Sequence, residues 1–278
     1  MKSVAVLFLA GDNPDKYVVS RLAGYWREEG LTVHFLFGTH RYVPADVLFL
    51  HVDLSVVPGR FLRLARRYPR TINGRVTDIR KRTFSSLALT RASTHTGPVI
   101  VKTNLNYGGS PERTLHPSSV VRAYHRARGA GFRFLTGSRE GVKYRVYPSM
   151  ASVPALVWFD PYFLVEKFLP ERVDDRYAVR TYHCFGEHDS CFLLTSPHPL
   201  VKSGRETETH PLEPDPRLRT IRRAFGLDYG KIDYVLVDDT PVILDVNKTV
   251  GLSSRYADDP VVAQARRERA RAIHDYLR

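Results

Sequence analysis

Three oxygen-bearing side chains in the C-terminal part of the chain have the types and the spacing that suit a magnesium ion. Asp233 lies in one apolar stretch, and Asp245 and Asn247 lie in the next, after a short polar turn. If the two stretches form a hairpin, both carboxylates lie at the same end of it, and Asp245 and Asn247 share a face. Carboxylate and amide oxygens are the ligands that Mg²⁺ prefers. Solvated hairpin carboxylates with a turn-forming Asn are the alternative interpretation.

A second pattern consists of a lysine at the end of an apolar strand and a glycine-bearing loop after it. Residues 98–102 end in Lys102, and Tyr107, Gly108 and Gly109 follow shortly afterwards. A lysine ammonium and the backbone N–H groups of such a loop both suit phosphate oxygens. A glycine turn after a strand is common, and the chain contains neither a GxxxxGK[ST] P-loop nor a complete GxGxxG fingerprint. The pattern alone is therefore also compatible with an ordinary connection.

A third pattern is an apolar strand with a carboxylate that runs into a proline-bounded linker, from Glu166 to Pro170. The backbone of such a segment can bind the edge of an adenine ring, or the segment is an edge strand with a surface Glu–Lys pair. Arg180 lies in the next apolar stretch. A charged side chain in that setting needs an anionic partner, which either the protein or a ligand supplies.

In this order, the three patterns resemble the ATP-grasp superfamily, which includes D-alanine–D-alanine ligase, glutathione synthetase and the glutamate ligases that modify ribosomal protein tails. The resemblance covers about residues 75–247. It implies an enzyme that binds ATP and two Mg²⁺ ions, activates a carboxylate as an acyl phosphate and joins it to an amine, releasing ADP and phosphate. The alternatives are an ATP-grasp small-molecule kinase and a non-catalytic basic protein that binds nucleotide or RNA.

The resemblance also implies a role for individual residues. The metal ligands would be Asp233, Asp245 and Asn247, although the family usually has Glu where this chain has Asp245. The charge that develops during catalysis would be offset by Arg180, Lys202 and Arg205. Residues 106–112 would form a flexible loop over the phosphates. The nucleotide-binding residues would be Lys81, Lys102, Tyr107, Gly108, Gly109, Glu166, Lys167, Phe168, Leu169 and Asp174.

The apolar periodicity predicts a protein of the α/β and α+β classes in three parts. A small N-terminal open α/β lobe would occupy residues 1–75, a central ATP-grasp lobe 76–165, and a C-terminal antiparallel-sheet lobe with the metal site 166–278. Helices are predicted at 14–29, 58–68, 78–89, 118–130, 214–225 and 259–277. Strands are predicted at 3–9, 31–37, 47–52, 98–102, 143–147, 155–159 and 162–168, with hairpins at 177–195 and 231–246.

The net charge of +13 and the isoelectric point near 9.9 favour anionic partners. The densest arginine clusters, at 60–70 and 266–271, have helical spacing without interleaved aromatic residues, which favours solvated helix faces over a nucleic-acid groove. Small-molecule or peptide carboxylates and amines are therefore the expected partners. Nucleic acid is not expected, and a homodimer is compatible with the sequence. No apolar stretch approaches the roughly 20 residues of a membrane span, so we expect no membrane partner.

The cysteines and histidines leave two further questions open. The chain has two cysteines, Cys184 and Cys191, too few for a disulfide framework, and we expect a cytoplasmic protein. With His183 and His188 they suggest zinc, but His183 and Cys184 would face opposite sides of a strand, which argues against it. A second pair, His51 and Asp53, shares a face at a strand end, where a structural role is favoured over the substrate cleft.

Overall fold

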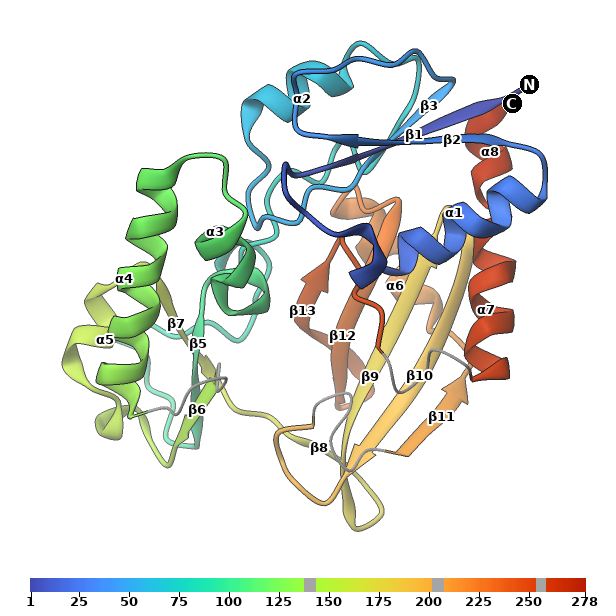
Figure 1. The fold of residues 1–278 in the computed structure, drawn as a ribbon. Coiled ribbons are helices and arrows are strands. Elements are labelled where there is room, and N and C mark those ends of the chain that lie inside the picture. Colours follow the sequence, from blue (N-terminus) through green and yellow to red (C-terminus); the bar gives the residue numbers. More distant parts are fainter. Residues whose placement is uncertain (138–143, 202–207, 254–258) are drawn as a thin grey trace.

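The computed structural model describes residues 1–137, 144–201, 208–253 and 259–278, which form three lobes (Figure 1). The N-terminal lobe is a parallel sheet of order β2-β1-β3-β4. Helix α1 packs on it through Val18, Leu22 and Trp26, the apolar face that the sequence predicts. Its elements are β1 (Ser3–Phe8), α1 (Val18–Glu28), β2 (Thr32–Phe37), β3 (Val47–Leu50), α2 (Gly59–Ala65) and β4 (Thr71–Ile72).

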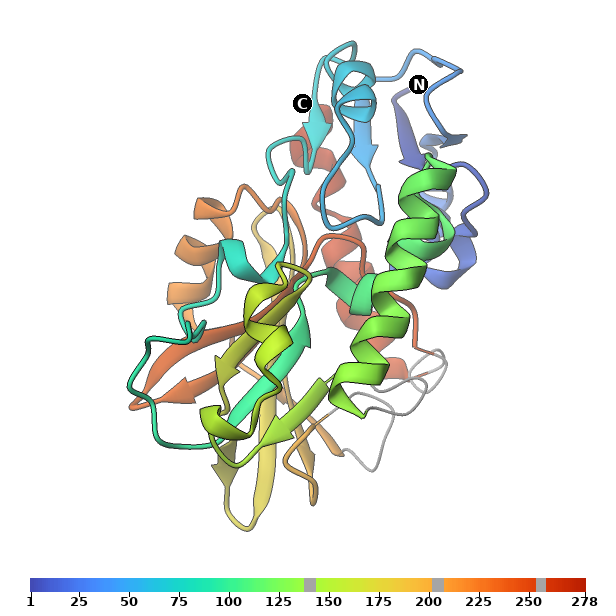
Figure 2. The same ribbon diagram turned by 90° about the vertical axis from the view of Figure 1, so that its left-hand side faces the viewer.

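The central lobe is an antiparallel sheet of order β6-β5-β7. Helices α4 and α5 lie on the side of this sheet that faces away from the C-terminal lobe (Figures 1 and 2), where Phe132 and Val157 pack against the strands. Its elements are β5 (Val99–Thr103), α3 (Ser110–Thr114), α4 (Ser119–Thr136), β6 (Tyr144–Tyr147), α5 (Ala155–Phe159) and β7 (Phe163–Lys167).

The C-terminal lobe is an antiparallel sheet of order β11-β10-β9-β12-β13, with β8 paired to β9. Helix α6 packs on one face of it, where Leu218 joins a core with Tyr182 and Ile232. Its strands are β8 (Glu171–Val173), β9 (Arg176–Phe185), β10 (His188–Ser196), β11 (Glu208–Leu212), β12 (Tyr229–Val237) and β13 (Thr240–Asn247). Its helices are α6 (Pro216–Ala224), α7 (Pro260–Ala270) and α8 (Ile273–Leu277).

The N-terminal and C-terminal lobes share one hydrophobic core. Phe185 and Tyr229 from the C-terminal sheet, together with Ile273 of α8, pack in the same cluster as Trp26 and Phe49 of the N-terminal lobe. The Trp26 indole also donates a hydrogen bond to the backbone carbonyl of Ala270, at 2.9 Å. Burial of these aromatic rings fixes the two lobes against each other, because each large ring removes on the order of 150–250 Å² from water.

Two sequence predictions of secondary structure are wrong. Ala155–Phe159 is a short helix and not a strand, because Pro154 precedes its first turn, where a missing N–H costs nothing. The predicted helix at 78–89 is reduced to one 3₁₀ turn, Lys81–Thr83. The backbone of Leu87 and Leu89 instead forms hydrogen bonds with β7, so that sheet pairing overrides the local helical preference.

The two arginine clusters differ in their exposure to solvent. The arginines between residues 60 and 70 are exposed, as predicted. Arg266 and Arg269 of α7 are buried, so the interpretation of this second cluster as a wholly solvated face is wrong for those two, although Arg267 and Arg271 are exposed. None of the helices within the described ranges combines the length and the apolar character of a membrane-spanning helix.

Candidate active site

The hairpin of β12 and β13 presents the three predicted metal ligands on one face. Asp233 lies directly opposite Asp245, and Lys231 lies directly opposite Asn247, so all four side chains leave the sheet in the same direction. The pairing of β12 with β13 shifts by one residue between Asp233 and Tyr234. This shift places Asp233 opposite Asp245, whereas the residues nearer the turn keep the register that the turn sets. The Asn247 side-chain oxygen already accepts a hydrogen bond from the Thr249 backbone, at 2.9 Å, and the Thr249 hydroxyl, which donates to Asp53, lies 3.3 Å from it.

Each carboxylate of the hairpin faces a lysine. The Lys81 ammonium lies 3.0 Å from Asp245 Oδ1 and also donates to the carbonyl of Leu105, at 3.1 Å. The Lys231 ammonium lies 2.9 Å from Asp233 Oδ2. Burial is the largest single effect and acts to lower the pKa of Lys231, but the charge and hydrogen bond of Asp233 and the charge of Asp245 together outweigh it, and the pKa is raised. Lys231 is therefore a cation at neutral pH.

A third lysine pairs with the carboxylate of the strand that the sequence predicts to bind adenine. Lys102 lies one residue before the end of β5, and its ammonium lies 2.5 Å from Glu166 Oε2 on the neighbouring strand β7. It also lies 5.9 Å from the centre of the Tyr144 ring, which projects from β6. Burial, and after it the charges of Asp245 and nearby carboxylates, raises the pKa of Tyr144, so this hydroxyl keeps its proton at neutral pH.

Two adjoining cavities open between the lobes. The smaller, of about 130 Å³, is lined by the segment that the sequence predicts to bind adenine, by Lys102 and by both hairpin aspartates. The larger, of about 610 Å³, reaches from the hairpin to α3 on one side and α7 on the other. Asp245 and Tyr144 line both cavities. From the predicted nucleotide-binding set, Lys102, Lys167, Phe168 and Leu169 line the smaller cavity.

The predicted phosphate loop, residues 106–112, lines the larger cavity and not the smaller one. Its residues Asn106, Tyr107, Ser110 and Pro111 line the larger cavity, and neither Gly108 nor Gly109 lines either one. Hydrogen bonds also hold this segment, which the sequence predicts to be flexible. The backbone N–H of Asn106 donates to the Ser55 hydroxyl, and Glu112 accepts from the Ser55 backbone, so both ends are fixed to the N-terminal lobe. The loop is therefore part of the wall between lobes.

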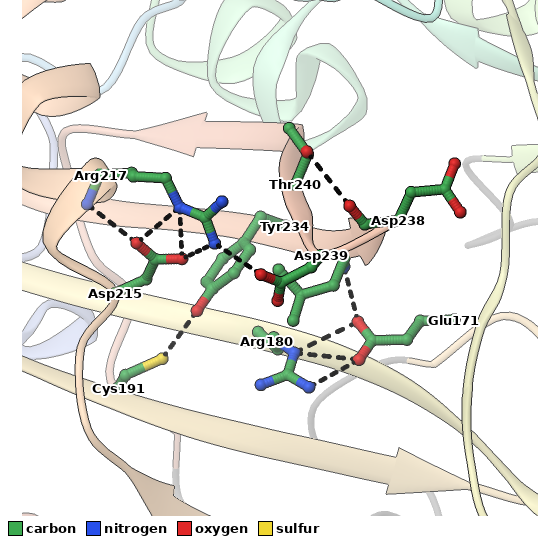
Figure 3. Close-up of polar contacts among 10 residues, drawn as sticks. Glu171, Arg180, Cys191, Asp215, Arg217, Tyr234, Asp238, Asp239 and Thr240 are labelled. Carbon is green, nitrogen blue, oxygen red and sulfur yellow. Dashed lines mark hydrogen bonds and ion pairs between the residues drawn. The ribbon is translucent and has the colours of Figure 1, made fainter.

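Arg180 lies on the far face of the C-terminal sheet, away from the hairpin carboxylates. Its guanidinium forms two hydrogen bonds with Glu171 Oε1, at 2.8 and 3.0 Å, and Glu171 also accepts from the Leu236 backbone (Figure 3). Arg180 lines neither cavity, so the sequence signal reflects an ion pair within the protein. Asp174, at the exposed turn after β8, also lines neither. Lys202 and Arg205 lie outside the described residues.

The N-terminal lobe contributes a polar corner to the larger cavity. Asp53 accepts hydrogen bonds from the Tyr17 hydroxyl at 2.8 Å and from the Thr249 hydroxyl at 2.6 Å. His51, the other member of the pair in the sequence, is fully buried among aromatic rings and does not line the cavity. Asp53 is therefore the member of this pair that a substrate can reach.

The cysteine and histidine cluster divides between the two faces of β9. His183 lines the larger cavity, whereas Cys184 lies in the core beneath α6, as strand alternation predicts. Burial is the main cause that lowers the pKa of His183 well below its usual value. Within the described ranges, no three His, Cys, Asp or Glu side chains are grouped so that they could hold a metal. The hairpin set has two carboxylates and an amide.

Sequence reasoning missed several residues of the site. Lys231 lies two positions before Asp233, so strand alternation alone could have placed both on one face. Tyr144 shows no such signal, because only the register of β6 against β5 brings it opposite Lys102. Arg266 and Arg269 line the larger cavity, and their helix reaches it only through the packing of α7 on the C-terminal sheet.

The comparisons with known proteins agree on the fold. No protein-family model matches the sequence, and no curated protein matches it. The D-alanine–D-alanine ligase from Bacillus anthracis is 13% identical, with a TM-score of 0.52 over 100% of this chain and 98% of its own. A RimK domain ATP-grasp protein from Sphaerobacter thermophilus is 11% identical, with a TM-score of 0.53 over 98% and 99%. A RiPP-associated ATP-grasp ligase from Chryseobacterium gregarium, in complex with ADP and a leader and core peptide, is 9% identical, with a TM-score of 0.50 over 99% and 97%. The chain therefore has the ATP-grasp fold that its motifs predict.

Proposed function

We propose that this protein is an ATP-dependent ligase that activates a carboxylate as an acyl phosphate and joins it to an amine. The observation that carries the proposal is the position of Asp245, which lines both cavities. A nucleotide in the smaller cavity and a substrate in the larger one would meet at this carboxylate. The fold of the similar ATP-grasp ligases supports the same general activity, although their low identity leaves the substrates open.

The smaller cavity has the chemistry that a nucleotide requires. Apolar side chains such as Leu169 and Leu244 line it together with Lys102 and Asp233. The apolar side chains suit an adenine ring, and the lysine and the carboxylates, which can share a cation, suit phosphates. We propose that the segment from Lys167 to Pro170 contacts the base. Lys81 and Lys102 then offset phosphate charge.

The hairpin fits a magnesium ion through its two carboxylates. Asp233 and Asp245 leave the sheet side by side, and hard oxygen ligands of this kind suit Mg²⁺. Asn247 would join them through the second lone pair of its side-chain oxygen, since the Thr249 hydroxyl donates its one proton to Asp53, at 2.6 Å. When bound there, Mg²⁺ would offset the negative charge of the phosphates. The ion pairs of Lys81 with Asp245 and of Lys231 with Asp233 would then weaken, so that both lysines become available to the phosphates.

The proposed reaction has two steps, phosphoryl transfer and amide formation. A carboxylate oxygen of the substrate attacks the γ-phosphorus of ATP, and the bond from that phosphorus to the leaving oxygen of ADP breaks. The amine nitrogen then attacks the acyl carbon, phosphate leaves, and the amine proton passes to solvent. Lys231 beside Asp233 lines the larger cavity and would stabilise the negative charge that develops on the phosphoryl oxygens. A nucleophilic side chain is not required.

Release of ADP tests the proposal directly. The full chain is incubated with Mg-ATP and a panel of amino acids, peptides and other carboxylates, each with and without an added amine, and products are identified by mass spectrometry. We expect ADP release that depends on both a carboxylate and an amine, with an amide product. A phosphorylated product without an amine would favour the kinase alternative. Absence of ATP binding, with submicromolar RNA affinity near physiological salt, would favour the basic scaffold alternative.

A further inference from the structure

The wall of the larger cavity formed by α7 contains two buried arginines. Val262, Arg266 and Arg269 all line the cavity, because their spacing places them on one face of the helix. Arg266 is 5% exposed and Arg269 is 6% exposed. Arg267 and Arg271, on the same helix and at its end, are exposed. Two arginines of the helix, Arg266 and Arg269, therefore line the cavity, and Arg267 and Arg271 are exposed to solvent.

Within the described part of the chain, Arg269 has no carboxylate at ion-pair distance. Its guanidinium donates to the hydroxyl of Ser190 on β10, a neutral partner. Burial lowers the pKa of Arg269, which indicates that its surroundings do not fully compensate the charge. A buried guanidinium without a counter-ion is costly, and an anionic ligand in the cavity it lines would remove that cost.

The region around these arginines is positive. His183 faces the same part of the cavity, and after burial the causes that lower its pKa are the charges of Arg269, Lys231 and Arg266. The carboxylates of Asp53 and Asp245, which also line the cavity, have partners away from the α7 end. Asp53 accepts hydrogen bonds in the N-terminal corner, and Asp245 pairs with Lys81 at the hairpin. A negative group would therefore be drawn to the α7 end.

The wall near α7 is partly apolar. Phe192 and Leu194 of β10 line the cavity together with Val262. At about 610 Å³, the cavity falls within the range of about 300–1,000 Å³ that is usual for ligand pockets. A molecule that spans it can therefore have a reactive end at Asp245, an apolar middle and a distant end at Arg269.

We propose that the substrate whose reacting group lies against Asp245 carries a second, anionic group, a carboxylate or a phosphate, which Arg269 and Arg266 bind at the α7 end of the larger cavity. This inference rests on the proposed function for the identity of the reacting end. The anion site itself does not, because it depends only on the two arginines and on the cavity they line. Planar guanidinium groups suit both kinds of anion.

Equilibrium binding of simple anions tests the site without any turnover. Malonate and inorganic phosphate are titrated at constant ionic strength, with saturating Mg-ADP present to occupy the nucleotide site, and the melting temperature and binding heat are measured. We expect both anions to stabilise the wild type. We expect Arg269→Gln to weaken binding about tenfold or more, and the exposed control Arg271→Gln to bind as the wild type does. The proposal is overturned if the wild type binds neither anion, or if Arg269→Gln binds as well as Arg271→Gln.

Two further variants test the same site if Arg269→Gln does not fold. Arg269→Lys keeps the charge but loses the planar guanidinium, so we expect weaker binding than in the wild type. Arg266→Gln removes the second cation, and we expect weaker binding there as well. Binding equal to the wild type in both variants would place the anions elsewhere and overturn the proposal.

Matched amines connect the site to turnover and separate the two anion sources. ADP release is compared for a dipeptide and its C-terminal amide, and for phosphoethanolamine and ethanolamine, and the same comparison is made for acids with and without a second anionic group. We expect a lower KM for the anionic member of one set in the wild type and in Arg271→Gln, and no such preference in Arg269→Gln. Anion binding without ADP release from any set would refute the proposed function and leave the anion site standing. ADP release that is indifferent to the second anionic group would refute the inference alone.

Discussion

The Lys81 ammonium lies 3.0 Å from Oδ1 of Asp245, and Lys81 is only 1% exposed. Lys81 belongs to the connection between the N-terminal and central lobes, whereas Asp245 belongs to the C-terminal hairpin. The pair therefore joins all three lobes at the point where the two cavities meet. If the proposed metal site draws Asp245 toward an ion, Lys81 would be released, so under the proposed function nucleotide binding would loosen this contact between lobes.

We predict that Asp245→Asn and Asp233→Asn each lower ADP release by about 100-fold or more. Loss of one anionic ligand weakens the metal site and removes charge stabilisation where the phosphoryl group is transferred. Asp245→Asn is also expected to lower the free energy of unfolding, because it leaves Lys81 buried without its counter-ion. Initial rates of ADP release and urea unfolding curves measure the two effects.

The matched control is Asp239→Asn. Asp239 lies at the turn of the same hairpin, and its side chain is 90% exposed. This variant should keep both the activity and the stability of the wild type, since an exposed pair contributes about 0–1 kcal/mol. Activity near that of the wild type in both Asp233→Asn and Asp245→Asn would rule out the metal assignment.

We predict that Lys102→Met weakens ATP binding and also lowers stability. The stability loss arises because Glu166, which is 1% exposed, loses its cation. The double variant Lys102→Met with Glu166→Gln removes both charges, so stability should recover while ATP affinity does not. Calorimetric titration with Mg-ATP and urea unfolding separate these outcomes. An exposed control on the adjacent strand, Arg145→Gln, should change neither, and unchanged ATP affinity in the double variant would show that Lys102 has only a structural role.

The local patterns in the sequence predict the hairpin and its carboxylates well. Strand alternation and a two-residue turn predict the hairpin, but Asp233 lies opposite Asp245 only because the pairing shifts by one residue between Asp233 and Tyr234. Lys102 is placed by its position at the end of a buried strand. The order of these motifs predicts the ATP-grasp fold, and solved ATP-grasp structures share that fold at only 9–13% identity.

The remaining part of the site depends on contacts that no local pattern encodes. Arg180 and Arg269 are both arginines beside apolar residues, yet Arg180 pairs with Glu171 on the far face while Arg269 lines the larger cavity. The packing of β8 and α7 around the sheet decides which of the two arginines lines a cavity. In the same way, no local pattern predicts that Ser55, from a different lobe, fixes residues 106–112.

We predict that Arg180→Gln lowers stability and leaves catalysis nearly unchanged. The substitution leaves the half-buried Glu171 without its bidentate partner, which costs on the order of 1–3 kcal/mol. Because Arg180 lines neither cavity, kcat and KM should stay within about threefold of the wild type at a temperature where the variant is folded. A loss of kcat beyond about 100-fold, with unchanged stability, would restore the catalytic role that the sequence suggests.

His51 is a buried base in an aromatic environment. Its ring centre lies 4.9 Å from that of Phe8 and 4.6 Å from that of Tyr17, and neither ring nitrogen has a hydrogen-bond partner within the described residues. Burial is the main cause that lowers the pKa of His51 to about 3, and the charge of Lys248 adds to it. The folded protein therefore keeps this imidazole neutral across the range in which an unfolded histidine takes up a proton.

We predict that His51 makes the protein lose stability in mild acid. The unfolded state binds a proton at this position below about pH 6.5, whereas the folded state does not until about pH 3, so stability rises with pH throughout that window. Between pH 7.5 and pH 5 the expected loss from His51 is about 2 kcal/mol. Urea unfolding at both pH values measures it, and His51→Asn, which cannot take up this proton, should lose about that much less than the wild type over the interval. His210→Asn, at an exposed histidine, should lose as much as the wild type. An equal loss in the wild type and in His51→Asn would mean that this imidazole is already protonated, or reached by water, in the folded protein.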